Sequence, residues 1–220
     1  MRRTLVLAVF VLLALPRMVS AQQAHPHPET TYVVRTGERL QAPYAASYRL
    51  VEVSQQRGRW ICPDIGYYDI GSRTEQLWFA GVGADLIHNK RLDWTQVVYV
   101  EQEAGVKAHN ERAMWIWPVL DLNLTNRLTS ETVVYPTIPL DHAQRWGFDI
   151  DRSKLEYLVH HRLRVGAGYS ASVGAESDWL SKPFLTATTY NRTGSWEFWL
   201  QRIQGGAQLQ LRYTLVRGAE

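Results

Sequence analysis

The chain has 220 residues, a length that suits one domain, and a formal charge of +3. Arg2, Arg3 and Arg17 lie in a segment that we expect to be removed, which leaves 21 of the 24 Lys and Arg residues against 21 Asp and Glu. The composition therefore gives no support for nucleic-acid binding, and a single cysteine, Cys62, excludes an intrachain disulfide framework.

The first 21 residues have the pattern of a cleavable secretion signal. Arg2 and Arg3 precede an almost unbroken apolar run at residues 4–15, and residues 19–21 are small enough for a cleavage site. The run of 12 residues is too short to span a bilayer comfortably. We therefore expect residues 1–21 to be a signal peptide that exports the chain; an uncleaved membrane anchor is the alternative.

Residues 22–45 are polar and contain Pro26, Pro28 and Pro43, which predicts a flexible or loosely docked N-terminal segment. From residue 46 to residue 220 the chain is rich in strand-like segments and forms the expected β-barrel domain. No stretch in it has 18 consecutive apolar residues, so we do not expect a transmembrane helix.

Apolar and polar residues alternate in these segments, as they do in strands with one apolar and one polar face. The alternation is unbroken at residues 207–215. Ten strands are expected, at 59–70, 76–87, 91–101, 111–124, 128–136, 150–159, 162–173, 181–190, 195–203 and 207–216. A further pair at 32–35 and 48–53 would make twelve.

A weak internal repeat marks the turns between these strands. Residues 89–92, 125–128 and 160–163 each place two polar residues before Arg-Leu, at spacings of 36 and 35 residues, and residues 191–194 form a fourth turn with a glycine. Longer loops are expected on the opposite rim, at 102–110, 137–149 and 175–180. This layout predicts an all-β, antiparallel, up-and-down transmembrane β-barrel of about ten strands, with eight to twelve as the range.

Strand alternation also assigns charged residues to the barrel interior. The candidate lumen or pore residues are Arg162, Arg164, Arg212, Asp85, Asp121 and Glu156. Asp93 and Glu131 are expected on the same side, so acids nearly balance the arginines. Two interpretations stay open: a salt-bridged plug, because buried charges persist when paired, and a narrow pore whose arginines favour anions.

Aromatic residues are abundant, with 9 Trp and 11 Tyr. The candidates for an aromatic girdle on the apolar faces are Trp78, Trp94, Tyr157, Tyr169 and Trp196. The alternation of side chains along the strands places Trp115, Trp117 and Trp199 on the inward face. There they either pack beneath a loop or stack on a flat ligand such as a sugar.

Residues 76–216 resemble small bacterial outer-membrane β-barrels of the porin-like type. The resemblance rests on the alternating strands, the polar-polar-Arg-Leu turns and the strand residues 166–169. Gln204, Gly206, Leu209 and Leu211 are similar to the C-terminal assembly signal of such proteins, although a terminal Phe is missing. The resemblance implies export to the bacterial outer membrane, insertion by the barrel-assembly machinery, and contact with outer-membrane lipid.

The function expected from this resemblance is a structural role or a narrow passive channel for small polar solutes. The alternative is a soluble, exported β-barrel or β-sandwich that binds a ligand. We expect no enzyme activity, although Ser170, Asp141, His142 and Glu176 leave a lipid or peptide hydrolase open. No cofactor and no metal site are expected, and the pair His160 and His161 is interpreted as a solvated turn. The solute and the oligomeric state are not specified by the sequence.

Overall fold

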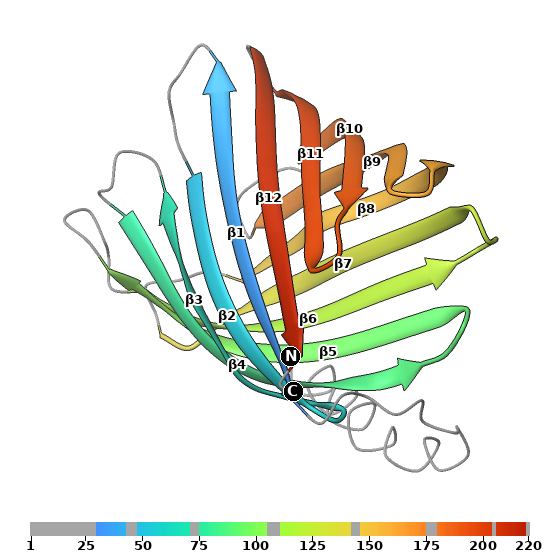
Figure 1. Cartoon of the computed structure of the whole chain (residues 1–220). Helices are drawn as coiled ribbons and strands as arrows, with labels where there is room; N and C mark the ends of the chain where they lie inside the picture. Colours follow the sequence, from blue (N-terminus) through green and yellow to red (C-terminus); the bar gives the residue numbers. More distant parts are fainter. Residues whose placement is uncertain are drawn as a thin grey trace, which may run out of the picture.

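The computed structural model describes residues 30–42, 48–70, 75–104, 111–141, 146–174, 180–203 and 206–218. These residues form one closed barrel in which each strand pairs with its neighbours in sequence and the first strand pairs with the last (Figure 1). The strands are β1 (Thr31–Ala42), β2 (Tyr48–Arg57), β3 (Trp60–Ile70), β4 (Glu75–His88), β5 (Leu92–Ala104), β6 (Arg112–Asn123), β7 (Leu128–Pro139), β8 (Gly147–His160), β9 (Leu163–Gly174), β10 (Leu180–Tyr190), β11 (Gly194–Ile203) and β12 (Gly206–Gly218). No helix among the described residues is long and apolar enough to cross a bilayer.

The barrel has twelve strands rather than ten, which is the upper end of the predicted range. All ten predicted segments occur, with ends within three residues of those expected. The two added strands are β1 and β2, at the position of the optional pair. The signal peptide and residues 22–29 lie outside the described residues.

Strand β1 closes the barrel, and the predicted flexible segment is wrong over residues 31–42. Its register with β12 runs without a shift from Thr31 opposite Gly218 to Ala42 opposite Ala207. In Figure 1, blue β1 lies beside red β12. Much of β1 is polar or glycine and alternates weakly, so its extended conformation comes from pairing on both sides rather than from its own pattern. The barrel therefore includes residues 31–42, which the sequence analysis placed before it.

The predicted turns share one rim of the barrel, and their repeated sequence has a physical cause. In two of them the first polar side chain accepts hydrogen bonds from the backbone N–H groups two and three residues later. Asn89 Oδ1 accepts from Arg91 and Leu92, at 2.8 and 3.0 Å. Thr125 Oγ1 accepts from Arg127 and Leu128, at 3.1 and 3.0 Å. Such local bonds favour a turn over continued pairing. A fifth turn on this rim has Gly58 at a φ of 57°, where glycine is unstrained.

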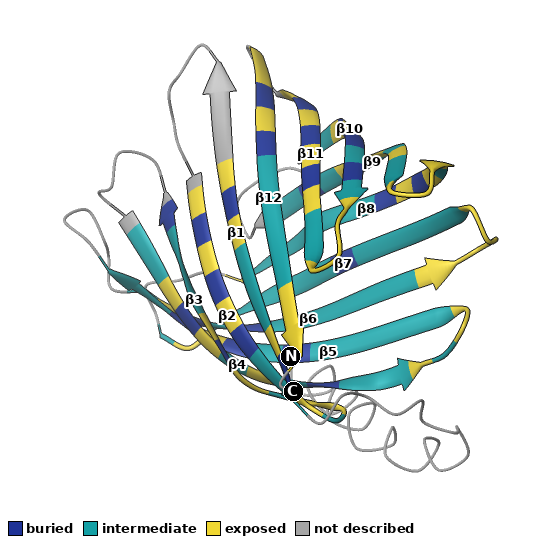
Figure 2. Cartoon of the chain, viewed as in Figure 1, coloured by how far each residue is buried: buried dark blue, intermediate teal, exposed yellow. Residues whose placement is uncertain are grey.

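The two faces of the wall differ as the alternation predicts. On β12, Gln210 is 4% exposed, whereas its neighbour Leu209 is 43% exposed. Figure 2 shows the same alternation as dark-blue and yellow bands along β11 and β12. On these two strands the inward face is mostly polar and the outward face apolar, the reverse of a soluble β-sandwich.

Glycines on the inward face let other groups approach the wall closely. A Cβ at Gly81 would clash with the ring of Tyr99, and a Cβ at Gly166 would clash with the backbone oxygen of Leu155. Gly81 thus leaves room for a ring, and Gly166 leaves room for the backbone of the neighbouring strand.

The ladder between β6 and β7 is interrupted. Pairing runs from Ala113 to Trp115 on β6 and resumes only at Val119. Pro118 lies in this gap on β6, and Pro136 lies in the matching stretch of β7. Because proline has no backbone N–H, two ladder donors are missing here.

Replacing Gly166 with valine should lower the free energy of unfolding by about 1–3 kcal/mol, the usual cost of forcing extra atoms into a packed site. The clash is with backbone, which cannot rotate away. Urea unfolding of the refolded barrel in detergent measures the change. Ala167→Val, on the exposed side of the same strand, is the control. Equal losses in the two variants would show that the inward face has room at Gly166.

Candidate site in the barrel lumen

One side of the lumen is filled by an aromatic cluster on strands β2 to β7. Its buried members are Leu50, Phe79, Val97, Tyr99 and Trp115, and Tyr68, Trp117 and Tyr135 are among the partly buried residues packed against them. The ring centroids of Phe79 and Tyr99 are 5.2 Å apart in an edge-to-face arrangement, and those of Trp117 and Tyr135 are stacked at 4.4 Å. These are the ring geometries that aromatic quadrupoles favour, so the cluster stiffens this side of the lumen.

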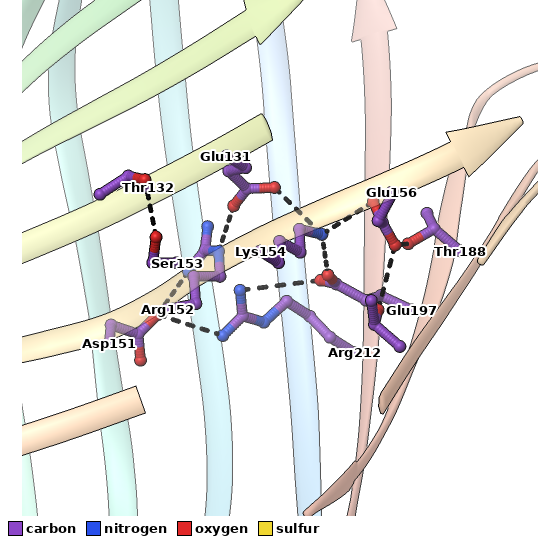
Figure 3. A network of polar contacts seen from close by, with 11 residues as sticks. Glu131, Thr132, Asp151, Arg152, Ser153, Lys154, Glu156, Thr188, Glu197 and Arg212 are labelled. Atoms are coloured by element: carbon purple, nitrogen blue, oxygen red, sulfur yellow. Dashed lines mark hydrogen bonds and ion pairs between the residues drawn. The ribbon is translucent and has the colours of Figure 1, made fainter. Parts of the chain in front are cut away.

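The opposite side carries an ion-pair network centred on Lys154 of β8 (Figure 3). The ammonium group of Lys154 lies 3.1 Å from Glu131 and 3.3 Å from Glu156, and it also contacts Glu197. Three carboxylates from three strands therefore share one cation. Thr186 and Thr188 also donate hydrogen bonds of 3.0 and 2.7 Å to Glu156.

Two arginines extend the network towards β12. Arg152 contacts both Glu131 and Asp151. Arg212 lies 3.7 Å from Asp151 and 3.9 Å from Glu197. A register shift between Ile150 and Ser153 explains why consecutive residues reach the same interior, because a β-bulge places two residues of one strand opposite one of the next.

Two cavities remain between these groups. The central cavity has a volume of about 190 Å³. Its lining includes the aromatic residues Tyr68, Phe79, Tyr99, Trp115 and Trp117 and the charged residues Arg35, Glu52, Asp64, Asp85, Asp121, Asp151, Arg152 and Arg212. The turn-side cavity has a volume of about 450 Å³. Its lining includes the charged residues Asp93, Asp121, Glu131, Glu156 and Arg164, together with His161. Asp121 lines both cavities, so they are adjacent.

Carboxylates outnumber guanidinium groups in both cavities. Five carboxylates and three guanidinium groups line the central cavity. Four carboxylates and one guanidinium group line the turn-side cavity. Asp93, Asp121 and Glu131 are direct cross-strand neighbours, an arrangement in which like charges repel. The five acids and three arginines that strand alternation assigns to the interior already carry the same excess of acid.

Of the sequence-predicted lumen residues, five point inward. Asp85 accepts a 2.6 Å hydrogen bond from Thr95, Arg164 donates a 2.9 Å bond to Thr129, and the guanidinium of Arg212 lies 5.0 Å from the ring centroid of Trp199. Asp121 and Glu156 line the cavities described above. Arg162 does not point inward. It lies in the exposed turn between β8 and β9, because the strand begins one residue later than predicted.

Several lumen residues escaped the sequence analysis. Arg35 and Glu52 lie on β1 and β2, which were only optional strands, and their side chains form a 2.5 Å ion pair. Asp64 follows Pro63 at a register shift, so simple alternation from the start of β3 fails there. Arg152 and Lys154 alternate with the predicted inward residue Glu156, so both were detectable. Glu197 was detectable, because it alternates regularly with the outward residues of β11.

Four of the five predicted girdle residues, Trp78, Tyr157, Tyr169 and Trp196, are exposed on the outer surface. The fifth, Trp94, is half-buried. Trp196 packs against Tyr213 at a centroid distance of 4.4 Å. Whether these rings form a girdle at a membrane interface stays a prediction.

The inward tryptophans pack against other rings rather than beneath a loop. Trp115 and Trp117 belong to the aromatic cluster, and Trp199 stacks on Phe184 at 4.5 Å. Ser170, the candidate nucleophile, accepts a 2.7 Å hydrogen bond from Gln201. His142 and Glu176 lie outside the described residues. The rings of His160 and His161 are in contact at 3.0 Å between nitrogens, because the turn brings neighbours to one side.

Comparison with solved structures finds the same fold in outer-membrane porins and channels. The KdgM porin aligns with a TM-score of 0.58 and 7% identity over 86% of this chain and 99% of that one. Its complex with disordered oligogalacturonate gives a TM-score of 0.60 at 7% identity over the same shares. The COG4313 outer membrane channel from Pseudomonas putida F1 aligns at 0.58 and 12% identity, over 90% of this chain and 98% of that one.

The NanC porin gives a TM-score of 0.56 at 8% identity, over 86% of this chain and all of that one. No protein-family model and no curated protein sequence matches this chain. At these identities the likeness is one of fold: the chain has the closed, up-and-down β-barrel fold of outer-membrane porins.

Replacing Lys154 with methionine should cost about 3–5 kcal/mol of stability, because three carboxylates lose the cation that they share. A lower urea midpoint of the refolded barrel would show this. Lys90→Met, in an exposed turn, is the matched control. Adding Glu197→Gln to Lys154→Met should restore part of the loss. If Lys154→Met is no less stable than the control, the network does not stabilise the interior.

Proposed function

We propose that the protein is an outer-membrane β-barrel that acts as a narrow passive channel for small polar solutes and favours cations. The observation that carries this proposal is a polar, acid-rich interior inside a closed barrel with an apolar outer surface. Passive passage of a solute neither forms nor breaks a covalent bond, so we propose no enzyme activity.

The apolar exterior supports a location in lipid. Val82, Leu185 and Leu200 are outward-facing, and Leu185 is 62% exposed. In water such a surface would favour aggregation. In a bilayer these side chains contact the lipid hydrocarbon chains instead, at little cost in free energy. Closure of the barrel also pairs the backbone polar groups between strands, which a membrane-spanning sheet requires. The soluble ligand-binding alternative does not account for this outer surface.

The interior supports a channel rather than a purely structural role. Barrels of eight strands have interiors that side chains fill, and wider barrels leave room for solute. With twelve strands, the aromatic cluster and the Lys154 network narrow the lumen without filling it, since the two cavities remain. Solutes that pass would be small and polar.

The charge of the lining supports cations. The KdgM complex contains oligogalacturonate, a polyanion. Here carboxylates outnumber basic groups in both cavities, so an anionic sugar chain would meet repulsion. The anion selectivity that the sequence suggested for Arg164 and Arg212 is therefore not proposed, although both side chains lie in the lumen.

The membrane location predicts different surroundings for neighbouring residues of β9. In a Cys62→Ser background, a bimane label at Val165→Cys should be quenched by brominated lipid, because Val165 faces outward. A label at Arg164→Cys should not be, because Arg164 faces the lumen. Equal quenching at both sites, or a mature chain that stays monomeric in water without detergent, would contradict the membrane location.

The channel predicts a cation-selective current in planar bilayers under a KCl gradient. Asp121→Asn should lower the K⁺/Cl⁻ permeability ratio by a factor of about 2–5, the effect of one charge at close range in water. Asp141→Asn is the control, since Asp141 instead accepts a hydrogen bond from the backbone of Arg112. No current, or a preference for Cl⁻, would overturn the proposal.

A further inference from the structure

We propose that the central cavity binds a small organic cation between the carboxylate of Asp64 and the aromatic cluster. This inference rests on the proposed function, because it names the class of solute that the same lumen would hold. Three observations carry it: a buried carboxylate oxygen without a partner, a surplus of negative charge around it, and aromatic rings on the same cavity wall.

The first observation concerns Asp64, which is only 2% exposed and lines the cavity. One of its oxygens, Oδ2, accepts a 2.7 Å hydrogen bond from the hydroxyl of Tyr99. The other, Oδ1, has no hydrogen-bond partner among the described residues. A buried charged acceptor in this state is costly unless a donor or cation reaches it.

The second observation concerns the charges that surround Asp64. Arg35 is the nearest basic residue that acts on it, but Arg35 is already hydrogen-bonded to Glu52 at 2.5 Å. Glu52 in turn repels Asp64. One guanidinium group therefore serves two carboxyl groups, and a cation in the cavity would stabilise the ionised form of Asp64.

The other two guanidinium groups of the cavity are also engaged. Arg152 contacts Glu131 and Asp151, and Arg212 lies 3.7 Å from Asp151. Neither is left as a dedicated partner for Asp64. The surplus of acid in the cavity is thus concentrated where Oδ1 is unpaired.

The third observation is the aromatic wall, which selects the kind of cation. Tyr68, Phe79 and Trp115 line the cavity beside Tyr99, and their centroids lie 5.2–6.1 Å apart. Aromatic faces attract organic cations and also accept their methyl and methylene groups. A metal ion needs several oxygen or nitrogen ligands instead, and no group of three such side chains occurs in the part of the chain that the structure describes.

The volume of the cavity fits this class of ligand. It measures about 190 Å³. An engineered cavity of about 150 Å³ in another protein takes up benzene. A molecule the size of choline, with one quaternary ammonium group, therefore matches the space as well as the charge.

The test compares choline with 3,3-dimethylbutan-1-ol, which has the same shape and no charge. Equilibrium dialysis with the chain refolded in detergent measures both. We expect choline to bind and the alcohol not to. Asp64→Asn, which removes the charge and keeps the shape, should weaken choline binding by at least about tenfold, a typical effect of losing a charged partner. Asp141→Asn should bind as tightly as the natural chain.

Choline that binds no better than the alcohol, or equally well to Asp64→Asn, would overturn the inference. If Asp64→Asn does not fold, the choline–alcohol comparison on the natural chain decides alone. Conductance is measured separately, so the two proposals fail separately. A conducting barrel without choline binding would overturn only the cation site, and a barrel that binds choline without conducting would overturn only the channel.

Discussion

Closure of the backbone ladder between β1 and β12 is the constraint on which the rest of the structure depends. The twelve residues of β1 pair in one uninterrupted register with β12, which removes both free edges of the sheet. The same register fixes which side chains point inward, because a shift of one residue would exchange the two faces. The apolar exterior, the acidic interior and the positions of both cavities follow from it.

Side chains then occupy much of the interior of the twelve-stranded barrel. Rings lie on one side and ion pairs on the other, and the two cavities remain between them. The inward glycines let the rings lie close to the wall, and Lys154 holds three carboxylates from different strands together. An ion pair inside a protein contributes little net stability, but its partners are expensive to separate. The network therefore fixes the positions of the strands more than it adds to their stability.

Most of the architecture could be predicted from the sequence, because strand alternation and turn chemistry act locally. The ten segments and their shared turn rim were found in this way, and Asn89 and Thr125 show why the turn motif recurs. The first two strands were harder, since β1 is held by its neighbours rather than by its own pattern.

The site was less predictable, because bulges change the facing of a residue without a clear sequence signal. Asp64 follows a register shift, Arg35 and Glu52 lie on the two strands that were only optional, and Arg162 falls outside the lumen by a single residue. The excess of acid could be predicted from alternation, whereas the ion pairs between distant strands depend on the three-dimensional arrangement.

The backbone ladder between β6 and β7 contains a gap in the pairing. Across it, the stacked rings of Trp117 and Tyr135, with planes only 5° apart, contribute contact where backbone pairing is missing. Those rings border the lumen, and Trp117 lines the central cavity. A molecule in the cavity that displaced Trp117 would therefore remove side-chain contact from a stretch of wall that already lacks backbone pairing.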